Sequence, residues 1–360
     1  MGVPSRASLV LLVASMAIAA GARGDAPPPL PGPAPQQRAA GFDAAAENLA
    51  CEGCHATIAA EWRGSLHHRA WDDPVFLTAY AIEPIAFCRG CHVPEADPAH
   101  LPPEGARRLG VGCVTCHVQD GAVVGEHAAP VRARVHAVVA DARAGSSAAC
   151  ERCHQFAFPE PQRAPMQGTA DEHRASPHAA ESCESCHMAR VRDQLGRPHR
   201  SHDFRVLGDP GRLRSALTAR AVRSGDRAIT LSISISISIA TARVGHAFPT
   251  GDMFRRLELR ARAVDAGGAV VAVASPVVLA RRFGRARAER IQIGDDRLPA
   301  SGEARTIDLA FAEPVSGREL RWEIVYQRLD AAMAQAFGVD AKADEVVVAE
   351  GALRPAKARR

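Results

Sequence analysis

The sequence predicts an α+β protein in which a mainly helical and irregular segment precedes an antiparallel β-sandwich domain. Two observations separate the two parts. All ten cysteines and all but one of the 15 histidines lie between Phe42 and Arg205, where frequent prolines limit helices to short lengths. Beyond Gly208 there is no cysteine, and apolar residues alternate with polar ones over several stretches, as in half-buried strands. The 360 residues are enough for about two domains.

The first 22 residues have the features of a secretory signal peptide. Arg6 gives a basic start, an apolar run follows from Leu9, and Ala20-Gly21-Ala22 is a small-x-small cleavage pattern. An uncleaved anchor is the alternative, but this apolar run is shorter than the roughly 20 residues that a spanning helix needs. We therefore expect a periplasmic or otherwise exported protein, with no membrane span after signal removal and a Pro-rich linker at 23–41.

The overall composition is that of a folded protein. Hydrophobic residues make up 47% of the chain and charged residues 23%, which excludes a disordered chain and a polytopic membrane protein. The sequence contains no phosphate-binding loop or nucleotide fingerprint, and nothing in it indicates nucleic-acid binding.

Every cysteine belongs to one repeated motif, C-x-x-C-H. The five copies are Cys51, Cys54 and His55; Cys88, Cys91 and His92; Cys113, Cys116 and His117; Cys150, Cys153 and His154; and Cys183, Cys186 and His187. This is the attachment motif of c-type haem. Two thiols three positions apart can reach the vinyl groups on one edge of a porphyrin, and the adjacent imidazole can then bind the iron. We therefore expect five covalently bound haem c groups, attached by haem-attachment machinery during maturation.

Two other uses of cysteine explain the pattern less well. Zinc sites would pair the C-x-x-C units two by two, which leaves one of five unpaired and the following histidines unexplained. A disulfide scaffold would need neither the regular spacing nor the histidines. Haem also accounts for the small number of apolar runs between Phe42 and Arg205, because porphyrins can supply the missing core.

We expect the sixth iron ligands mainly among the ten remaining histidines. An internal repeat, E-[W/H]-R-[G/A]-S-x-H, ends at His67 and at His178, and we interpret both as distal ligands, with His68 as the substitute for His67. By position, at least one of His127 and His136 and at least one of His199 and His202 are expected to bind iron as well. A methionine ligand, Met166 or Met253, is a further alternative.

The stretches Trp62–Pro74, Gly110–Gly121, Cys150–Phe156 and Met166–Met188 resemble the multihaem c-type cytochromes related to the tetrahaem electron acceptor of hydroxylamine oxidoreductase. The resemblance covers about 150 residues through its W-x-x-S-x-H, GV-x-C-x-x-CH and C-x-x-CHM segments. It implies mostly bis-histidine haems, sometimes with one five-coordinate haem, and distal ligation by His67 and His178. The chain departs from the family pattern in its fifth motif, in His173 where the pattern has Trp, and in its long C-terminal extension.

The C-terminal part reads as strands joined by turns. Ile229–Ile239 alternates without a break, Leu257–Arg262 alternates similarly, and a turn at Asp265–Gly268 leads into the apolar run 269–279. Further strands are expected at 305–311, at 320–327 with Trp322, Ile324 and Tyr326 inward, and at 346–349. The resulting domain plan is a pentahaem cytochrome c domain at 42–205, a linker at 206–224, a β-sandwich at 225–350 and a basic tail at 351–360.

One loop within the β-domain is of special interest. Gly245-His246-Ala247-Phe248-Pro249-Thr250-Gly251 presents the only histidine of this domain between two strands. We expect the loop to dock on the first domain, with His246 either as an iron ligand or as a turn residue that only packs there. The first domain has an acidic excess and the second a basic excess, which favours docking.

These features predict a cytochrome that relays electrons between redox partner proteins through closely spaced, mostly bis-histidine haems. The alternative is an oxidoreductase with one open haem that acts on a small nitrogen or sulfur compound. The spin state of the irons distinguishes the two.

Overall fold

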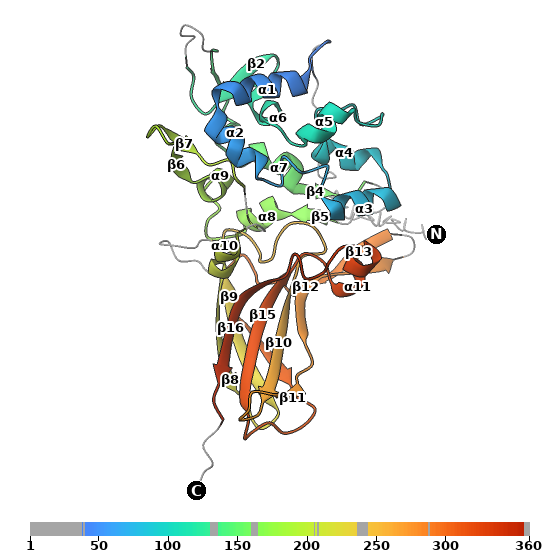
Figure 1. The fold of residues 1–360 in the computed structure, drawn as a ribbon, viewed down its shortest axis with the longest axis vertical. Coiled ribbons are helices and arrows are strands. Elements are labelled where there is room, and N and C mark those ends of the chain that lie inside the picture. The colour runs from blue at the N-terminus through green and yellow to red at the C-terminus, as the bar shows by residue number, and fades with distance from the viewer. Residues whose placement is uncertain are drawn as a thin grey trace, which may run out of the picture.

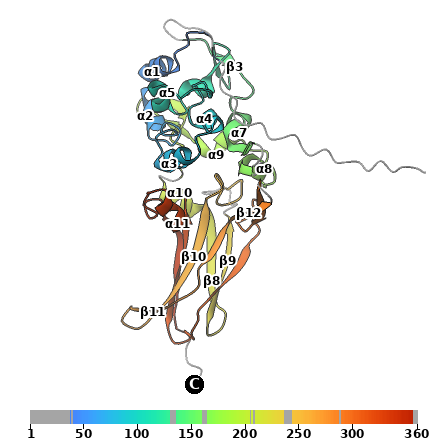
Figure 2. The same ribbon diagram turned by 90° about the vertical axis from the view of Figure 1, so that its right-hand side faces the viewer.

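The computed structural model describes residues 38, 40–129, 136–159, 165–204, 206, 209–235, 244–286 and 289–355. The predicted signal peptide lies outside these residues, as do most of the Pro-rich linker and the last five residues of the predicted tail. The molecule is elongated, with the helices at one end and the long strands at the other (Figures 1 and 2). Within the described ranges, no helix is long and apolar enough to cross a membrane.

The first half is built from short helices, as the prolines predict. They are α1 (Ala44–Cys54), α2 (Ala56–Arg63), α3 (Pro74–Ile82), α4 (Ala86–His92), α5 (Glu104–Leu109), α6 (Cys113–His117), α7 (Ala148–His154), α8 (Thr169–Arg174) and α9 (Cys183–His187). Asp43 caps α1 by accepting from two backbone amides, and Asp73 caps α3, where Pro74 occupies the first turn. Between the helices lie short strands: β1 (Val118–Gln119), β2 (Ala122–Gly125), β3 (Val139–Ala140), β4 (Gln155–Ala157), β5 (Pro165–Gly168), β6 (Arg190–Arg192) and β7 (Pro198–Arg200).

The second half consists of two antiparallel sheets. Its elements are α10 (Pro210–Ser215), β8 (Leu217–Arg223), β9 (Ala228–Ile235), β10 (Arg256–Val264), β11 (Val270–Val273), β12 (Val277–Ala286), β13 (Glu289–Asp295), β14 (Arg305–Ala310), β15 (Glu319–Gln327), α11 (Ala331–Ala336) and β16 (Val346–Leu353). The larger sheet has the order β13-β12-β10-β15-β16, with β11 also paired to β10, and the smaller has the order β14-β9-β8. Both sheets contribute to one hydrophobic cluster, in which Ile229, Leu259 and Ile324 have no exposed surface. The α+β prediction is confirmed.

Several predicted boundaries need correction. Residues 206–224, predicted as a linker, hold α10 and β8, whose Leu213 and Leu217 are buried in the core cluster. Strand β16 continues to Leu353 in the predicted tail, because it pairs with β15 over its whole length. The apolar run 269–279 is divided between β11 and β12, and β13 was not predicted. Residues 236–239 of the predicted alternating strand lie outside the described residues.

The two halves differ in how much apolar core they contain. The largest cluster lies entirely in the β half, whereas the helical half has two small clusters, one around Trp71 and Tyr80 and one around Trp62. The helical half therefore has a poor protein core, as its sequence predicts.

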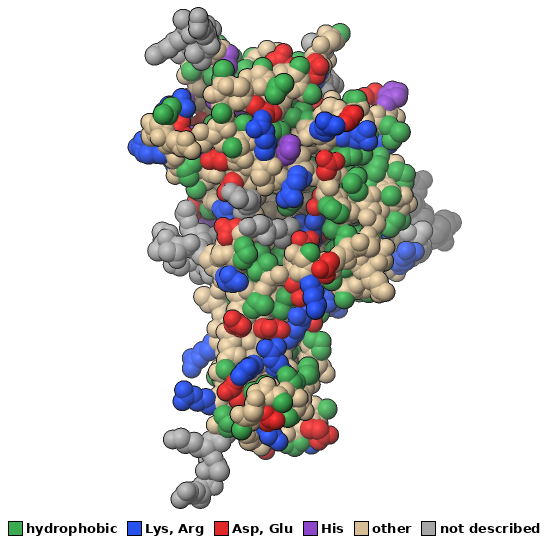
Figure 3. Space-filling view, viewed as in Figure 1, with side chains coloured by type: hydrophobic (Ala, Val, Ile, Leu, Met, Phe, Trp, Pro, Cys, Tyr) green, Lys and Arg blue, Asp and Glu red, His purple; other side chains and the backbone are tan. Residues whose placement is uncertain are grey.

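The halves meet through both apolar and polar contacts. Val75 of α3 packs against Leu329 and Ala334 at α11, and the Thr78 hydroxyl donates to the Phe337 carbonyl at 3.3 Å. On the face in Figure 3, acidic and basic side chains are interspersed over the narrow β half. Arg281 of β12 is buried and donates to the Pro165 and Met166 carbonyls of the helical half.

Candidate haem-binding sites

Each C-x-x-C-H motif lies on or ends a short helix. We number them in chain order: site 1 (Cys51–His55), site 2 (Cys88–His92), site 3 (Cys113–His117), site 4 (Cys150–His154) and site 5 (Cys183–His187). One helical turn separates the two cysteines of each motif, which puts both thiols on one side of the helix. The ten cysteines form no disulfide.

Four motif histidines face a second histidine from elsewhere in the chain. The ring centres of His55 and His136 are 6.2 Å apart, those of His117 and His202 6.1 Å, those of His154 and His67 6.2 Å, and those of His187 and His246 6.2 Å. A metal–imidazole bond is about 2 Å long and the ligating nitrogen lies about 1 Å from the ring centre, so an iron between two imidazoles separates their centres by about 6 Å. The four spacings therefore fit an iron atom between each pair.

The hydrogen bonds of these rings also suit metal ligation. The facing histidines His136, His202 and His246 use Nδ1 to bond the carbonyls of Ala137, Arg200 and Ala247 at 3.1, 2.7 and 2.9 Å. In the motif histidines, Nδ1 of His117 bonds the Val124 carbonyl at 3.2 Å and Nδ1 of His154 bonds Gln167 Oε1 at 3.1 Å. A proton held on Nδ1 leaves Nε2 free as the metal-binding nitrogen.

Burial keeps the imidazoles neutral. It lowers the pKa of His67 and of His92 to about 4. Burial and the nearby His246 lower the pKa of His187 to about 3. Neutral imidazole is the form that binds metals, so these rings are ready ligands at neutral pH.

Site 2 is different. All 15 histidines lie in the described ranges, and none of them faces His92 as the four partners face their motif histidines. Instead, the Phe76 ring stacks on the His92 ring with their centres 3.5 Å apart and their planes 9° apart. Nδ1 of His92 is hydrogen-bonded to the Ala70 carbonyl. Site 2 therefore has a positioned motif histidine and no histidine to complete a pair.

The turn that carries His67 is held by residues of the first repeat. The Trp62 indole donates to the Val111 carbonyl at 2.8 Å, and the Ser65 hydroxyl donates to the Trp62 carbonyl at 2.6 Å. The Val111 amide in turn donates to the His67 carbonyl at 2.9 Å. The tryptophan and serine of the repeat thus orient the turn from which His67 reaches site 4.

Gly110 allows this turn to approach closely. Its φ is +58°, and a Cβ there would lie 2.6 Å from the His67 carbonyl oxygen and 2.5 Å from that of His68. Gly110→Ala should destabilise the protein by about 2 kcal/mol or more, because it combines left-handed strain with a backbone clash. It should also weaken the low-spin signal of one haem, measured by EPR alongside thermal unfolding.

Gly121→Ala is the matched control for this prediction. Gly121 has a similar φ of +78°, but a Cβ there meets nothing within 4 Å. Gly121→Ala should introduce backbone strain without a clash, and it should leave the haem spectra unchanged. Equal spectra in the two variants would contradict the role of Gly110 at site 4.

The other candidate ligands have different surroundings. Nδ1 of His178 bonds Glu181 at 2.7 Å, and its buried Nε2 has no hydrogen-bond partner among the described residues. The side chain of His127 is 83% exposed, and His199 bonds Glu61 at 3.0 Å. His68 packs edge-on against Trp62. None of these four rings faces a motif histidine at the spacing of the four pairs.

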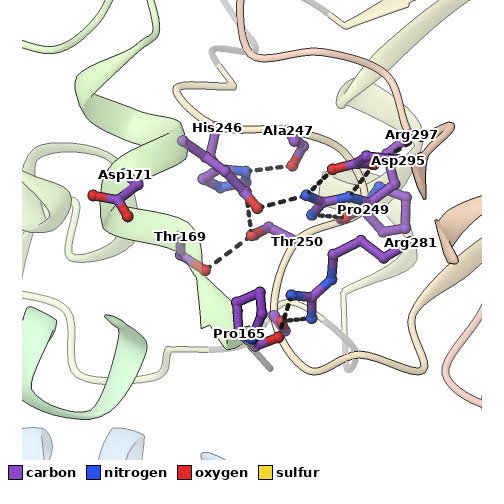
Figure 4. A network of polar contacts seen from close by, with 12 residues as sticks. Pro165, Thr169, Asp171, His246, Ala247, Pro249, Thr250, Arg281, Asp295 and Arg297 are labelled. Carbon is purple, nitrogen blue, oxygen red and sulfur yellow. Dashed lines mark hydrogen bonds and ion pairs between the residues drawn. The ribbon is translucent and has the colours of Figure 1, made fainter. Parts of the chain in front are cut away.

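A polar network fixes the loop that carries His246 (Figure 4). The Thr250 hydroxyl bonds Glu172 at 2.6 Å and Thr169 at 2.9 Å, both from α8. Arg297, only 6% exposed at its side chain, pairs with Glu172 at 2.7 Å and donates to the Pro249 carbonyl at 3.0 Å. The ring planes of His246 and His187 lie 17° apart. The β half thus brings an imidazole to site 5 on an anchored loop.

The sites lie next to one another. The Cys91 thiol of site 2 lies beside Cys153 of site 4, and Cys150 of site 4 lies beside Cys183 of site 5. The Phe204 ring contacts both His67 and His202, which face sites 4 and 3. Burial, the facing His136 and His117 of site 3 together lower the pKa of His55, which puts site 3 close to site 1. The contacts run from site 1 through 3 and 4 to 5, with site 2 joined to site 4.

Residues 50–118 match the family described as cytochrome c554 and c-prime. Among solved structures, the chain is similar to a penta-heme cytochrome c552 from Thermochromatium tepidum, with a TM-score of 0.67 and 21% identity, over 86% of this chain and 98% of that chain. The chain has the fold of a multihaem c-type cytochrome.

The other comparisons add nothing to this multihaem cytochrome fold. A beta-glucuronidase from glycoside hydrolase family 2 matches over 39% of this chain and 11% of its own, with 10% identity and a TM-score of 0.18, too low to indicate a shared fold. No curated protein matches the sequence. The family match includes sites 1 to 3 and the turn carrying His67.

Proposed function

We propose that this protein is an exported pentahaem cytochrome that relays electrons between redox partner proteins. The observation that carries the proposal is the set of four imidazole pairs at 6.1 to 6.2 Å, one across each of sites 1, 3, 4 and 5. Two imidazole ligands give a low-potential iron, and a c-type haem held this way exchanges one electron without binding a substrate. The ten motif cysteines would hold the five groups covalently, and the chain's own fold would fix their geometry.

In this proposal, the distal ligands are His136 for site 1, His202 for site 3, His67 for site 4 and His246 for site 5. The Nδ1 hydrogen bonds of His136, His202 and His246 support three of these assignments, because they orient each ring and leave Nε2 for the iron. The helical half from 42 would be the haem domain, and the two sheets would form a sandwich domain that adds the fourth of these ligands. The N-terminal signal pattern supports export.

The contacts between sites support a branched path, 1–3–4–5 with site 2 attached to site 4. We expect the double variant Cys150→Ala, Cys153→Ala, which lacks the haem of site 4, to divide this path. After partial photoreduction, electron exchange among the remaining four haems should slow by orders of magnitude, because sites 1 and 3 lose contact with sites 2 and 5. Transient absorption measures this rate.

The matched control is Cys88→Ala, Cys91→Ala, which also removes one haem but from the end of the branch. Exchange among the other four should stay close to the wild-type rate. Equal rates in the two double variants would contradict the proposed path.

A second function is favoured by site 2 alone. Because His92 has no facing imidazole, we propose that an iron there is open to a small nitrogen or sulfur compound, such as nitrite or sulfite. Cyanide should then bind the oxidised protein at one haem per chain, seen as a change in the Soret band. The variant lacking the site 2 haem should not respond. A wild-type protein that binds no cyanide would leave the relay as the only function.

A further inference from the structure

The β half contacts the helical half near site 2 through an ion pair. Arg328, between β15 and α11, donates from both terminal nitrogens to the two carboxylate oxygens of Asp73, each at 2.7 Å. The side chains are 13% and 10% exposed, so the pair is largely shielded from water. A two-bond arginine–carboxylate pair fixes the position and orientation of both groups.

Asp73 lies in the middle of residues 70–76, a segment that contacts the His92 ring at both of its ends. Oδ1 of Asp73 also accepts from the Phe76 amide at 3.0 Å and caps α3, which fixes the start of the helix. The Asp73 amide donates to the Arg69 carbonyl at 3.0 Å. Asp73 therefore connects the turn before it to the helix after it.

Both ends of this segment touch the His92 ring. The Ala70 carbonyl accepts its Nδ1 hydrogen bond, and Phe76 stacks on its face at 3.5 Å. The ring centres of Trp71 and Tyr80 each lie 5.5 Å from that of Phe76. These two rings restrict the movement of the Phe76 phenyl ring. The His92 imidazole is thus contacted by residues on both sides of Asp73.

From this chain of contacts, we infer that Arg328 of the β half is a positioning residue for His92, the iron ligand of site 2. This inference rests on the proposed haem attachment at Cys88 and Cys91. Through Asp73, Arg328 holds Ala70 and Phe76 against the imidazole and so fixes the plane in which the ring meets the iron. The β half would then act on two irons, on site 5 directly through His246 and on site 2 through Arg328.

The test is the variant Arg328→Met in the full, haem-loaded chain. We expect the EPR g-values and the midpoint potential of one haem to change, while the other four stay as in wild type. The signal is assigned with Cys88→Ala, Cys91→Ala, from which it must be missing. Arg328→Lys, which retains the charge but not the two-bond geometry, should give a partial change.

Two further variants distinguish the positioning of His92 from a general weakening of the interface between the two halves. Thr78→Val removes another contact between α3 and the β half, the bond to the Phe337 carbonyl, without touching the residues around His92, and should leave all haem signals unchanged. Phe76→Leu removes the ring on His92 directly and should change the site 2 signal at least as much as Arg328→Met.

The outcomes are distinguishable. A change with Phe76→Leu but none with Arg328→Met or Arg328→Lys would overturn the inference and leave haem attachment at site 2 intact. Equal changes with Thr78→Val and Arg328→Met would also overturn it, because any loosening of the interface would then suffice. A protein with no haem at Cys88 and Cys91, shown by its mass, would instead refute the proposed function at this site. If Arg328→Met does not fold, Arg328→Lys with the Thr78→Val control decides.

Discussion

A chain in which all ten motif cysteines are changed to alanine should lose the fold of residues 42–205 and keep that of the β half. The helical half has only small apolar clusters around Trp62 and around Trp71, too few to stabilise a domain of its length. The β half has one large cluster shared by both of its sheets. Limited proteolysis with mass spectrometry should therefore yield one resistant fragment that begins near α10, and far-UV circular dichroism should show strand signal with little helix.

The matched control for this experiment is the wild-type sequence matured with haem, which should resist cleavage in both halves. A protease-resistant helical half in the all-alanine chain would contradict the proposed role of haem as the core of this half.

The second large effect is expected at His246. His246→Ala should convert one low-spin haem to a high-spin haem, because the ring that faces His187 at 6.2 Å is lost. Five haems should remain attached, since attachment depends on the C-x-x-C-H motifs. His246→Met should keep that haem six-coordinate and raise its midpoint potential, because a thioether ligand favours the reduced iron. EPR and a spectroelectrochemical titration measure both changes.

His178→Ala is the control for His246. His178 is also buried and lies beside Gly245, but its ring faces no motif histidine. We expect this control to leave all spin states unchanged. If His178→Ala produced a high-spin haem and His246→Ala did not, the ligand interpretation based on the E-x-R-x-S-x-H repeat would replace the one based on the structure.

The strands show which parts of the fold a local sequence pattern can predict. The alternation in Ile229–Ile235 predicts a strand with one buried face, and Ile229, Leu231 and Ile233 are fully buried. Strand β8 has a less regular alternation of apolar and polar residues, and α10 is short. The sequence therefore predicts a linker at 206–224, where the structure has both elements. The position of β8 depends on its pairing with β9, and α10 packs against β16 and β8. Both are long-range properties of the fold.

The candidate haem sites also contain residues that a local pattern predicts and residues that it does not. The motif cysteines and histidines can be read from spacing alone, because attachment requires them to be adjacent on one helical turn. The facing histidines cannot, because each pair joins residues brought together by folding, as in His67 and His154. His67 and His178 end the same repeat, yet only the first faces a motif histidine. The glycine-flanked loop 245–251 did predict that His246 lies against the first domain. In the structure its ring lies beside site 5.

The most direct test of the account is EPR of the fully oxidised, haem-loaded protein with spin quantitation against a standard. Four imidazole pairs and one unpaired motif histidine predict low-spin ferric signals from four haems and a separate signal, without the features of two imidazole ligands, from the fifth. The fifth signal should be missing from Cys88→Ala, Cys91→Ala. Fewer than four bis-imidazole irons, or a fifth signal that persists in that variant, would contradict the account.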